Sequence, residues 1–205
     1  MRKQWLVASG QWRKDDGAQN STSCGLPIIL AGAFMVAMVA TSLLAQEPPG
    51  GLTHTRTEFR FTANAAWEQV APLFGANGER KWSPDWNPLF LYPQPAHDQA
   101  GMVFKVMHGQ HEATWVNTAF DLAAGHIQYT YILADAMATL IDIHLTRKGA
   151  QKTEVAVVYE RTALIPEANE HVQHFARGDQ KAEKEWEEAI NGYLANKATP
   201  SPAQK

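Results

Sequence analysis

Five successive segments of this chain alternate apolar and polar side chains, which is the pattern of a β-strand with one buried face. They cover residues 102–108, 111–120, 126–133, 139–146 and 153–163. The links between them are short, and short links join neighbouring strands that run antiparallel. The sequence therefore predicts one antiparallel meander at the centre of the fold.

The first hairpin of this meander has a predicted register. Gly109 is the first of two loop residues, a position at which glycine favours a type II′ turn. The expected cross-strand pairs are His108–His111, Phe104–Trp115 and Met102–Asn117. We expect the inward face of the whole sheet to hold Met102, Phe104, Val106, His108, His111, Ala113, Trp115, Asn117, Ala119, Ile127, Tyr129, Tyr131, Leu133, Ile141, Ile143, Leu145, Val155, Val157, Tyr159 and Arg161. Asp142, His144 and Glu160 are expected to face outward.

A long amphipathic helix is predicted over residues 166–196. Apolar side chains recur there three, four or seven positions apart, at Val172, Phe175, Ala176, Ala182, Trp186, Ala189, Ile190, Tyr193 and Leu194. Pro166 suits a first helical turn, where its missing N–H would have no partner. The apolar stripe is interrupted at residues 177–179, where Arg177, Gly178 and Asp179 stand.

The segment before the meander is shorter and less regular. Residues 52–61 alternate as a first strand. Asn64 is then expected to cap a helix whose buried stripe is Trp67, Val70, Ala71 and Phe74, with a second helical turn at residues 79–82. Residues 83–95 are rich in proline and aromatic side chains and predict an ordered irregular segment, with a short strand at residues 89–92.

An uncharged apolar stretch at residues 26–45 is long enough to cross a bilayer. Arg2, Lys3, Arg13 and Lys14 precede it, so the positive-inside rule places residues 1–25 in the cytosol and exports the chain from residue 46 onward. The stretch is either a cleaved signal peptide or a retained anchor, and both alternatives make the protein periplasmic or membrane-anchored. Residues 46–51 are then a linker, residues 52–196 one domain and residues 197–205 a disordered tail.

Charge and cysteine usage exclude several function classes. Of the 18 Lys/Arg and 21 Asp/Glu residues, residues 1–45 hold four and two, so the exported part is mildly acidic and no nucleic-acid partner is expected. Cys24 is the one cysteine and it precedes the apolar stretch, which excludes disulfides and thiol chemistry from the domain. Gly-rich phosphate loops, nucleophile elbows and Cys/His metal spacings do not occur, and no cofactor is expected.

The order of strand, two short helices, antiparallel meander and long C-terminal helix resembles the START-like, or SRPBCC, superfamily. The likeness spans residues 52–194 and is carried by residues 61–67 (FTANAAW), 79–86 (ERKWSPDW), 114–116 (TWV), 159–164 (YERTAL) and 186–190 (WEEAI). It implies an α+β helix-grip fold, in which a curved antiparallel sheet wraps around the last helix. Members hold hydrophobic ligands between sheet and helix, and some are carriers or sensors, polyketide cyclases or aromatases, or chaperone activators. The export segment argues against a cytosolic chaperone partner here.

This resemblance places a ligand cavity over the inward polar and aromatic side chains. The predicted ligand-binding residues are Phe104, His108, His111, Trp115, Asn117, Tyr129, Tyr131, Tyr159, Arg161, Phe175 and Gly178, with Gly178 leaving room above the sheet. The alternative is that the buried polar groups only complete a large core by bonding the backbone.

The opposed pair His108–His111 is the sharpest local feature. Directly paired residues have Cβ atoms about 5 Å apart, within reach of one metal or a shared proton. A metal site is not expected, because a catalytic zinc normally has three protein ligands and the nearest carboxylate, Glu112, faces the other way. His171 and His174 are expected at the solvated rim of the last helix.

Three functions stay open on the sequence. We expect a non-enzymatic exported protein that binds a hydrophobic or aromatic small molecule. The second possibility is a cyclase- or hydrolase-type enzyme that uses His108 or His111 with Tyr129 or Tyr131 for proton transfer. The third is an interaction module of the cell envelope whose interior is only packing.

Overall fold

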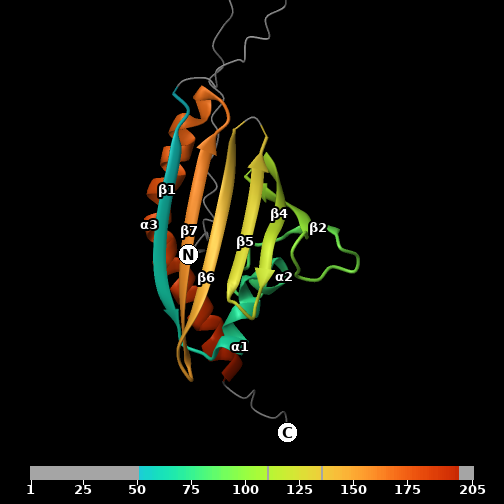
Figure 1. The fold of residues 1–205 in the computed structure, drawn as a ribbon, viewed down its shortest axis with the longest axis vertical. Helices are drawn as coiled ribbons and strands as arrows, with labels where there is room; N and C mark the ends of the chain where they lie inside the picture. The colour runs from blue at the N-terminus through green and yellow to red at the C-terminus, as the bar shows by residue number, and fades with distance from the viewer. Residues whose placement is uncertain (1–50, 110, 135, 199–205) are drawn as a thin grey trace, which may run out of the picture. The chain divides into compact units, whose positions relative to one another are not determined.

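The structure is a computed structural model that describes residues 51–198 except 110 and 135. These residues form a seven-stranded sheet in the order β1-β7-β6-β5-β4-β3-β2, in which every neighbouring pair is antiparallel (Figure 1). The strands are β1 (His54–Ala63), β2 (Leu89–Tyr92), β3 (Val103–His108), β4 (His111–Asp121), β5 (His126–Leu133), β6 (Met137–Gly149) and β7 (Lys152–Ala163). The predicted meander is β3 to β7, and β1 closes beside β7.

The register of the first hairpin is confirmed. His108 pairs with His111 and Phe104 with Trp115. Asn117 N–H donates to Met102 O at 2.9 Å, which continues the same pairing. Gly109 has a φ of 63°, a value that glycine adopts without the steric cost of a Cβ.

A β-bulge in β4 changes the facing of one residue. Ala119 pairs with Gln128 and Phe120 with Ile127, because the register shifts between Asn117 and Ala119. Phe120 therefore packs against the core, and the prediction that Ala119 faces inward is wrong. With its amide oriented so that the nitrogen faces carbonyl oxygens, Asn117 donates to Ala119 O (2.6 Å) and Gln128 O (3.0 Å) and fills the bulge.

The last helix covers one face of the sheet along β1 (Figure 1). A turn of 3₁₀-helix, η2 (Pro166–Ala168), leads into α3 (Asn169–Ala198), which ends two residues beyond the predicted end. Two asparagines of α3 fix the two ends of β1. Asn169 Oδ1 accepts from Thr53 N (2.7 Å), while Asn191 Oδ1 accepts from Asn64 N (2.7 Å) and its Nδ2 donates to Thr62 O (2.9 Å).

The segment between β1 and β2 forms three single turns, α1 (Trp67–Val70), η1 (Ala71–Phe74) and α2 (Ala76–Glu79). The predicted cap Asn64 is wrong: Ala66 precedes α1, and Asn64 instead bonds to Asn191. Pro72 has no N–H to continue an α-helical ladder, so the chain tightens into a 3₁₀ turn there. The predicted turn at residues 79–82 belongs to the end of this series, since Ser83 N donates to Glu79 O (2.9 Å).

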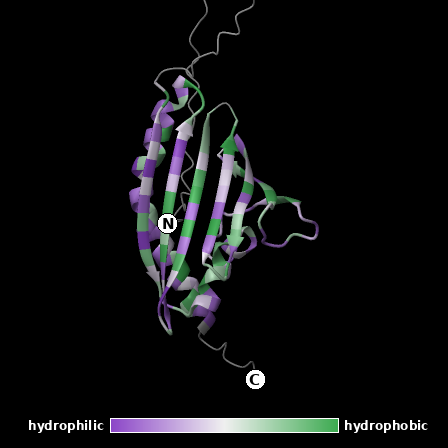
Figure 2. Ribbon diagram, viewed as in Figure 1, coloured by the Kyte–Doolittle hydropathy of each residue, from purple (hydrophilic) through white to green (hydrophobic). Residues whose placement is uncertain are grey.

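The two faces of the sheet differ in hydropathy, as Figure 2 shows by alternating colours along the strands. The buried side is one continuous core that includes Phe74, Phe104, Ile127 and Val157. The predicted cytosolic segment, the apolar stretch at residues 26–45 and nearly all of the linker lie outside the described residues. Within residues 51–198, no helix has the length and apolar character needed to span a bilayer.

Candidate functional site

A cavity of about 120 Å³ lies between the sheet and α3. This is room for much more than one water molecule, because a single water needs roughly 10–15 Å³ on the same measure. Its wall is mostly aromatic, with Phe74, Trp82, Trp86, Trp115, Tyr129, Tyr131, Tyr159, Phe175 and Trp186. The polar members of the wall are Glu79, Ser83, His108, Arg161, Asp179 and Glu185.

A buried ion pair joins sheet and helix at this wall. The guanidinium of Arg161, on β7, donates to both carboxylate oxygens of Asp179 on α3, with Nη2 to Oδ1 at 2.9 Å, and the Thr57 hydroxyl also donates to Asp179. The two side chains are 3% and 6% exposed. Burial opposes the charged form of Arg161, but its hydrogen bond to Asp179 and the nearby charge raise the pKa of the guanidinium. The opposite charges of Arg161 and Asp179 therefore cancel, and the ion pair contributes no net charge to the cavity.

His108 stands in a stack of flat rings. Its imidazole lies 5.2 Å from the ring centre of Tyr131 and 5.8 Å from that of Trp115, with interplanar angles of 16° and 6°. Burial lowers the pKa of His108 to about 4, since the charged form loses its hydration. At neutral pH the residue is an uncharged imidazole whose Nε2 has no hydrogen-bond partner among the described residues.

Glu79 is the second titratable group with a displaced pKa. It ends α2, lines the cavity and is partly buried. Burial and then the negative charge of Asp98 raise the pKa of its carboxyl to about 8. At neutral pH the group is mostly a protonated acid that can donate a hydrogen bond.

Three tyrosines complete the polar wall as protonated phenols. Burial raises the pKa of Tyr129, of Tyr131 and of Tyr159 above the usual value. The Tyr129 hydroxyl donates to Phe74 O at 2.8 Å. Besides the Glu185 carboxylate, the cavity combines aromatic surface, neutral donors and a self-neutralised ion pair, which suits an uncharged aromatic molecule better than an anion.

Most of the predicted ligand-binding residues meet at this cavity, from four strands and α3. Those that line it are His108, Trp115, Tyr129, Tyr131, Tyr159, Arg161, Phe175 and Gly178. Three others do not. Phe104 is wholly buried beside Trp115, Asn117 fills the bulge, and His111 is exposed at the start of β4. The two histidines are paired in register, but His108 alone reaches the cavity.

Sequence reasoning missed several wall residues. Trp82 and Trp86 come from the irregular segment, where no period shows which side chains turn inward, and Glu79 has no local signal of burial. Asp179 did have a signal, because it falls in the gap of the helical stripe. An acidic residue at a position where an apolar one is due indicates either an exposed break or a buried partner, and Arg161 is that partner.

No protein-family model and no curated protein matches this chain. Solved structures do match it. Norcoclaurine synthase from Thalictrum flavum has 12% sequence identity and a TM-score of 0.55, with 83% of this chain and 99% of that chain covered. The aromatase/cyclase Zhui from Streptomyces sp. R1128 has 15% identity and a TM-score of 0.52, over 72% and 97% of the two chains.

A third similar structure is Ara h 8.0201, at 16% identity and a TM-score of 0.50, which covers 70% of this chain and 99% of its own. At identities this low, the likeness establishes the architecture and leaves the activity open. The predicted fold class is confirmed: these residues form an α+β helix-grip fold, with a curved antiparallel sheet, short helices after the first strand and one long C-terminal helix.

Proposed function

We propose that this protein binds a small, flat, uncharged molecule in the cavity between the sheet and α3. The observation that carries the proposal is the wall itself. His108 Nε2, Trp115 Nε1 and Arg161 Nε are buried polar atoms of wall residues, and none has a hydrogen-bond partner within the described part of the chain. Buried polar groups are nearly always paired, so an occupant or ordered water is needed beside them.

The same atoms indicate the chemistry of the occupant. Trp115 Nε1 and Arg161 Nε can only donate, which favours a molecule with hydrogen-bond acceptors such as a carbonyl or phenol oxygen. A free anion finds no unpaired cation in the wall described here, because Asp179 already neutralises Arg161. Similar architecture supports an aromatic occupant, since norcoclaurine synthase from Thalictrum flavum (13% identity, TM-score 0.54) has been solved with dopamine and hydroxybenzaldehyde.

Calorimetric titration of the full-length chain in mild detergent tests the proposal, with 2-naphthol as the probe and the detergent buffer as the blank. Naphthalene-2-sulfonate has the same ring system with a charged group and should bind at least about tenfold more weakly. Equal affinity for both compounds, or no binding of 2-naphthol, would contradict an uncharged aromatic occupant.

Two glycines of α3 supply the matched variants. A Cβ at Gly178 meets no atom within 4 Å and the residue lines the cavity, so Gly178→Leu places a side chain into the open space. Gly192 has equally open surroundings but does not line the cavity. We expect Gly178→Leu to weaken 2-naphthol binding at least about tenfold and Gly192→Leu to leave it unchanged. Equal effects of the two variants would show that binding occurs elsewhere.

A second candidate function is acid–base catalysis in the same cavity. The observation that favours it is the protonated carboxyl of Glu79, with a pKa of about 8, in one wall with the neutral imidazole of His108 and the phenol of Tyr129. A proton donor and a proton acceptor around one cavity could enolise a bound ketone. Exchange of the α-hydrogens of 2-tetralone in D₂O, followed by NMR, tests this candidate.

We expect Glu79→Gln and His108→Ala to slow this exchange and His111→Ala, outside the cavity, to leave it unchanged. Of the two candidate histidines, His108 lines the cavity, whereas His111 is exposed at the start of β4. If the wild-type chain does not accelerate exchange at all, the cavity only binds.

We also propose that the domain acts outside the cytoplasm. The support is the run of basic residues before the uncharged stretch at residues 26–45, all outside the described residues. Alkaline phosphatase fused after residue 51 should be active in intact bacteria, whereas a fusion of the same enzyme after residue 20 should be inactive. Inactivity of the first fusion would contradict export.

A further inference from the structure

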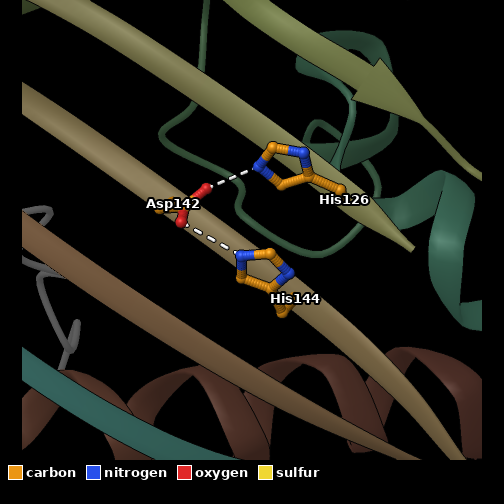
Figure 3. Close-up of side chains that lie close together, drawn as sticks. All are labelled: His126, Asp142 and His144. Atoms are coloured by element: carbon orange, nitrogen blue, oxygen red, sulfur yellow. Dashed lines mark hydrogen bonds and ion pairs between the residues drawn. The ribbon is translucent and has the colours of Figure 1, made fainter. Parts of the chain in front are cut away.

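The face of the sheet opposite α3 carries a cluster of two imidazoles and one carboxylate. Asp142 of β6 lies between His126 of β5 and His144 of β6, as Figure 3 shows. His126 Nε2 is 2.7 Å from Asp142 Oδ1, and His144 Nε2 is 3.0 Å from Asp142 Oδ2. The two rings are parallel within 6°, with centres 4.6 Å apart. One ligand atom of each of the three residues lies within 4.8 Å of the other two.

Neighbouring side chains hold the carboxylate in place. Gln128 Nε2 donates to Asp142 Oδ1 at 3.2 Å, and the Oε1 of the same amide accepts from the Thr118 hydroxyl at 2.9 Å. A hydrogen-bonded chain thus runs from β4 across β5 to β6. Such outer partners orient the ligands of protein metal sites and raise their affinity.

The cluster stands on a rigid part of the fold. His126 pairs directly with His144 and Gln128 with Asp142, on two strands that both lie inside the sheet. Their neighbours along the two strands, Ile127, Ile141 and Ile143, are buried on the other face. The cluster is therefore separated from the cavity by the sheet and is no part of its wall.

We propose that His126, Asp142 and His144 bind one divalent transition-metal ion, of which Zn²⁺ is the reference case. Two neutral imidazoles and one carboxylate form the donor set that Zn²⁺, Co²⁺ and Cu²⁺ prefer, whereas Mg²⁺ and Ca²⁺ require mainly oxygen ligands. Asp121, paired with His126 in the register, adds a second negative charge at this end of the sheet. Three protein ligands leave at least one coordination position for water or for a group on another molecule.

The present separations are compatible with this site after small rotations. Bonds of roughly 2.0–2.1 Å to a tetrahedral Zn²⁺ place the ligand atoms roughly 3.3 Å apart. His126 Nε2 lies 2.7 Å from Oδ1 of Asp142 and His144 Nε2 lies 3.0 Å from Oδ2, and one ligand atom of each residue lies within 4.8 Å of the other two. Each neutral imidazole that binds through Nε2 carries its proton on Nδ1, so both rings have to adopt that tautomer.

Titration of the full-length chain, free of any polyhistidine tag, with Co²⁺ tests the site. We expect one Co²⁺ per chain with the visible d–d absorption of a low-coordinate ion, loss of that absorption on addition of Zn²⁺, and its removal by a chelator. His126→Ala, Asp142→Asn and His144→Ala should each weaken binding at least about tenfold, and Gln128→Leu by a smaller factor because it only orients the carboxylate. Calorimetry with Zn²⁺ gives the same comparison for the second ion.

The matched control is His54→Ala, which removes an exposed histidine on β1 whose ring bonds to Thr162. This variant should bind the metal as the wild type does. His144 is 54% exposed, so its replacement leaves the fold intact and a loss of binding there is a loss of a ligand. Absence of one-to-one binding, or equal binding by His144→Ala, would overturn the proposal and leave the cluster as an ion-pair network.

Discussion

The pKa of a carboxyl group is shifted in opposite directions on the two faces of this sheet. On the cavity side, burial and then Asp98 raise the pKa of Glu79 to about 8. On the outer side, burial also disfavours the carboxylate of Asp142, yet hydrogen bonds from His126, His144 and Gln128 lower the pKa of that group below its usual value. Both groups are carboxyls. The hydrogen-bond donors that lie beside each carboxyl decide which protonation state the fold stabilises.

Asp179 is another carboxyl on the cavity side. Its partners show which contacts stabilise a buried negative charge there. It is nearly as inaccessible as its partner Arg161 and accepts from two residues, Arg161 and Thr57. The buried carboxylate of Asp179 is thus accompanied by a cation and a hydroxyl donor, whereas Glu79 has neither among the described residues and burial raises its pKa.

The largest expected effect comes from removing one half of the inner ion pair. Asp179→Ala leaves the guanidinium of Arg161 buried without a counter-charge and should lower the free energy of unfolding by about 3–5 kcal/mol. Urea denaturation measures this change. The matched control is Glu188→Ala in the same helix, whose pair with Lys184 spans 3.7 Å between side chains 60% and 80% exposed, and the expected cost is about 0.5 kcal/mol or less. A similar fall in the free energy of unfolding for both variants would contradict the difference expected between a buried and an exposed ion pair.

The next effect concerns Glu79 and depends on pH. Its folded pKa is raised, so its contribution to stability is full below about pH 4, the unfolded value, and is lost as pH rises through about 8. Glu79→Gln should match the wild type near pH 4 and exceed its free energy of unfolding by roughly 2–4 kcal/mol above pH 8. Denaturation curves across this range measure the difference, and a constant difference would show that the carboxyl is not protonated in the folded state.

A smaller effect is expected at the cavity wall from Tyr129→Phe. The change removes the donor to Phe74 O, and the buried carbonyl loses its hydrogen bond. The free energy of unfolding should fall by about 1–2 kcal/mol. Tyr92→Phe is the control. Tyr92 is 56% exposed, so this substitution should change the free energy of unfolding little. Equal effects would mean that the buried hydroxyl is replaced by water.

The smallest effect is expected on the outer face. Because the folded pKa of Asp142 is lowered, its contribution is present above about pH 4 and is lost as pH falls through the folded value. Asp142→Asn should cost about 1 kcal/mol or less at neutral pH, since the group is partly solvated, and nothing in strong acid. Asp85→Asn, at an exposed position, is the control and should leave the free energy of unfolding at neutral pH close to the wild-type value in the same urea measurement. A larger cost at low than at neutral pH would contradict the sign.

Much of the fold was predictable because its signals are local. The alternation along β3 to β7 and the spacing along α3 each depend on side chains a few positions apart, and Gly109 determines the hairpin that pairs His108 with His111. The error at Ala119 has the opposite origin. One extra residue in β4 shifts the facing of the residues after it, and no nearby residue signals it.

The candidate site was predicted less completely. Tyr129, Tyr131, Tyr159 and Arg161 were identified because strand periodicity gives the face on which a residue lies. Glu79, Trp82 and Trp86 were not, since their positions depend on how an irregular segment folds back against the sheet.

The sequence by itself determined the strands, the last helix and the face on which each regular residue lies, because backbone geometry converts spacing into direction. Only the tertiary structure decided which of those residues are neighbours. Asp179 contacts Arg161 and His126 contacts Asp142, but the members of each pair are too far apart in the sequence for helix or strand periodicity to relate them. Both contacts depend on how the helix and the strands are placed beside one another. The gap in the helical stripe was visible in the sequence, but its partner on β7 was not.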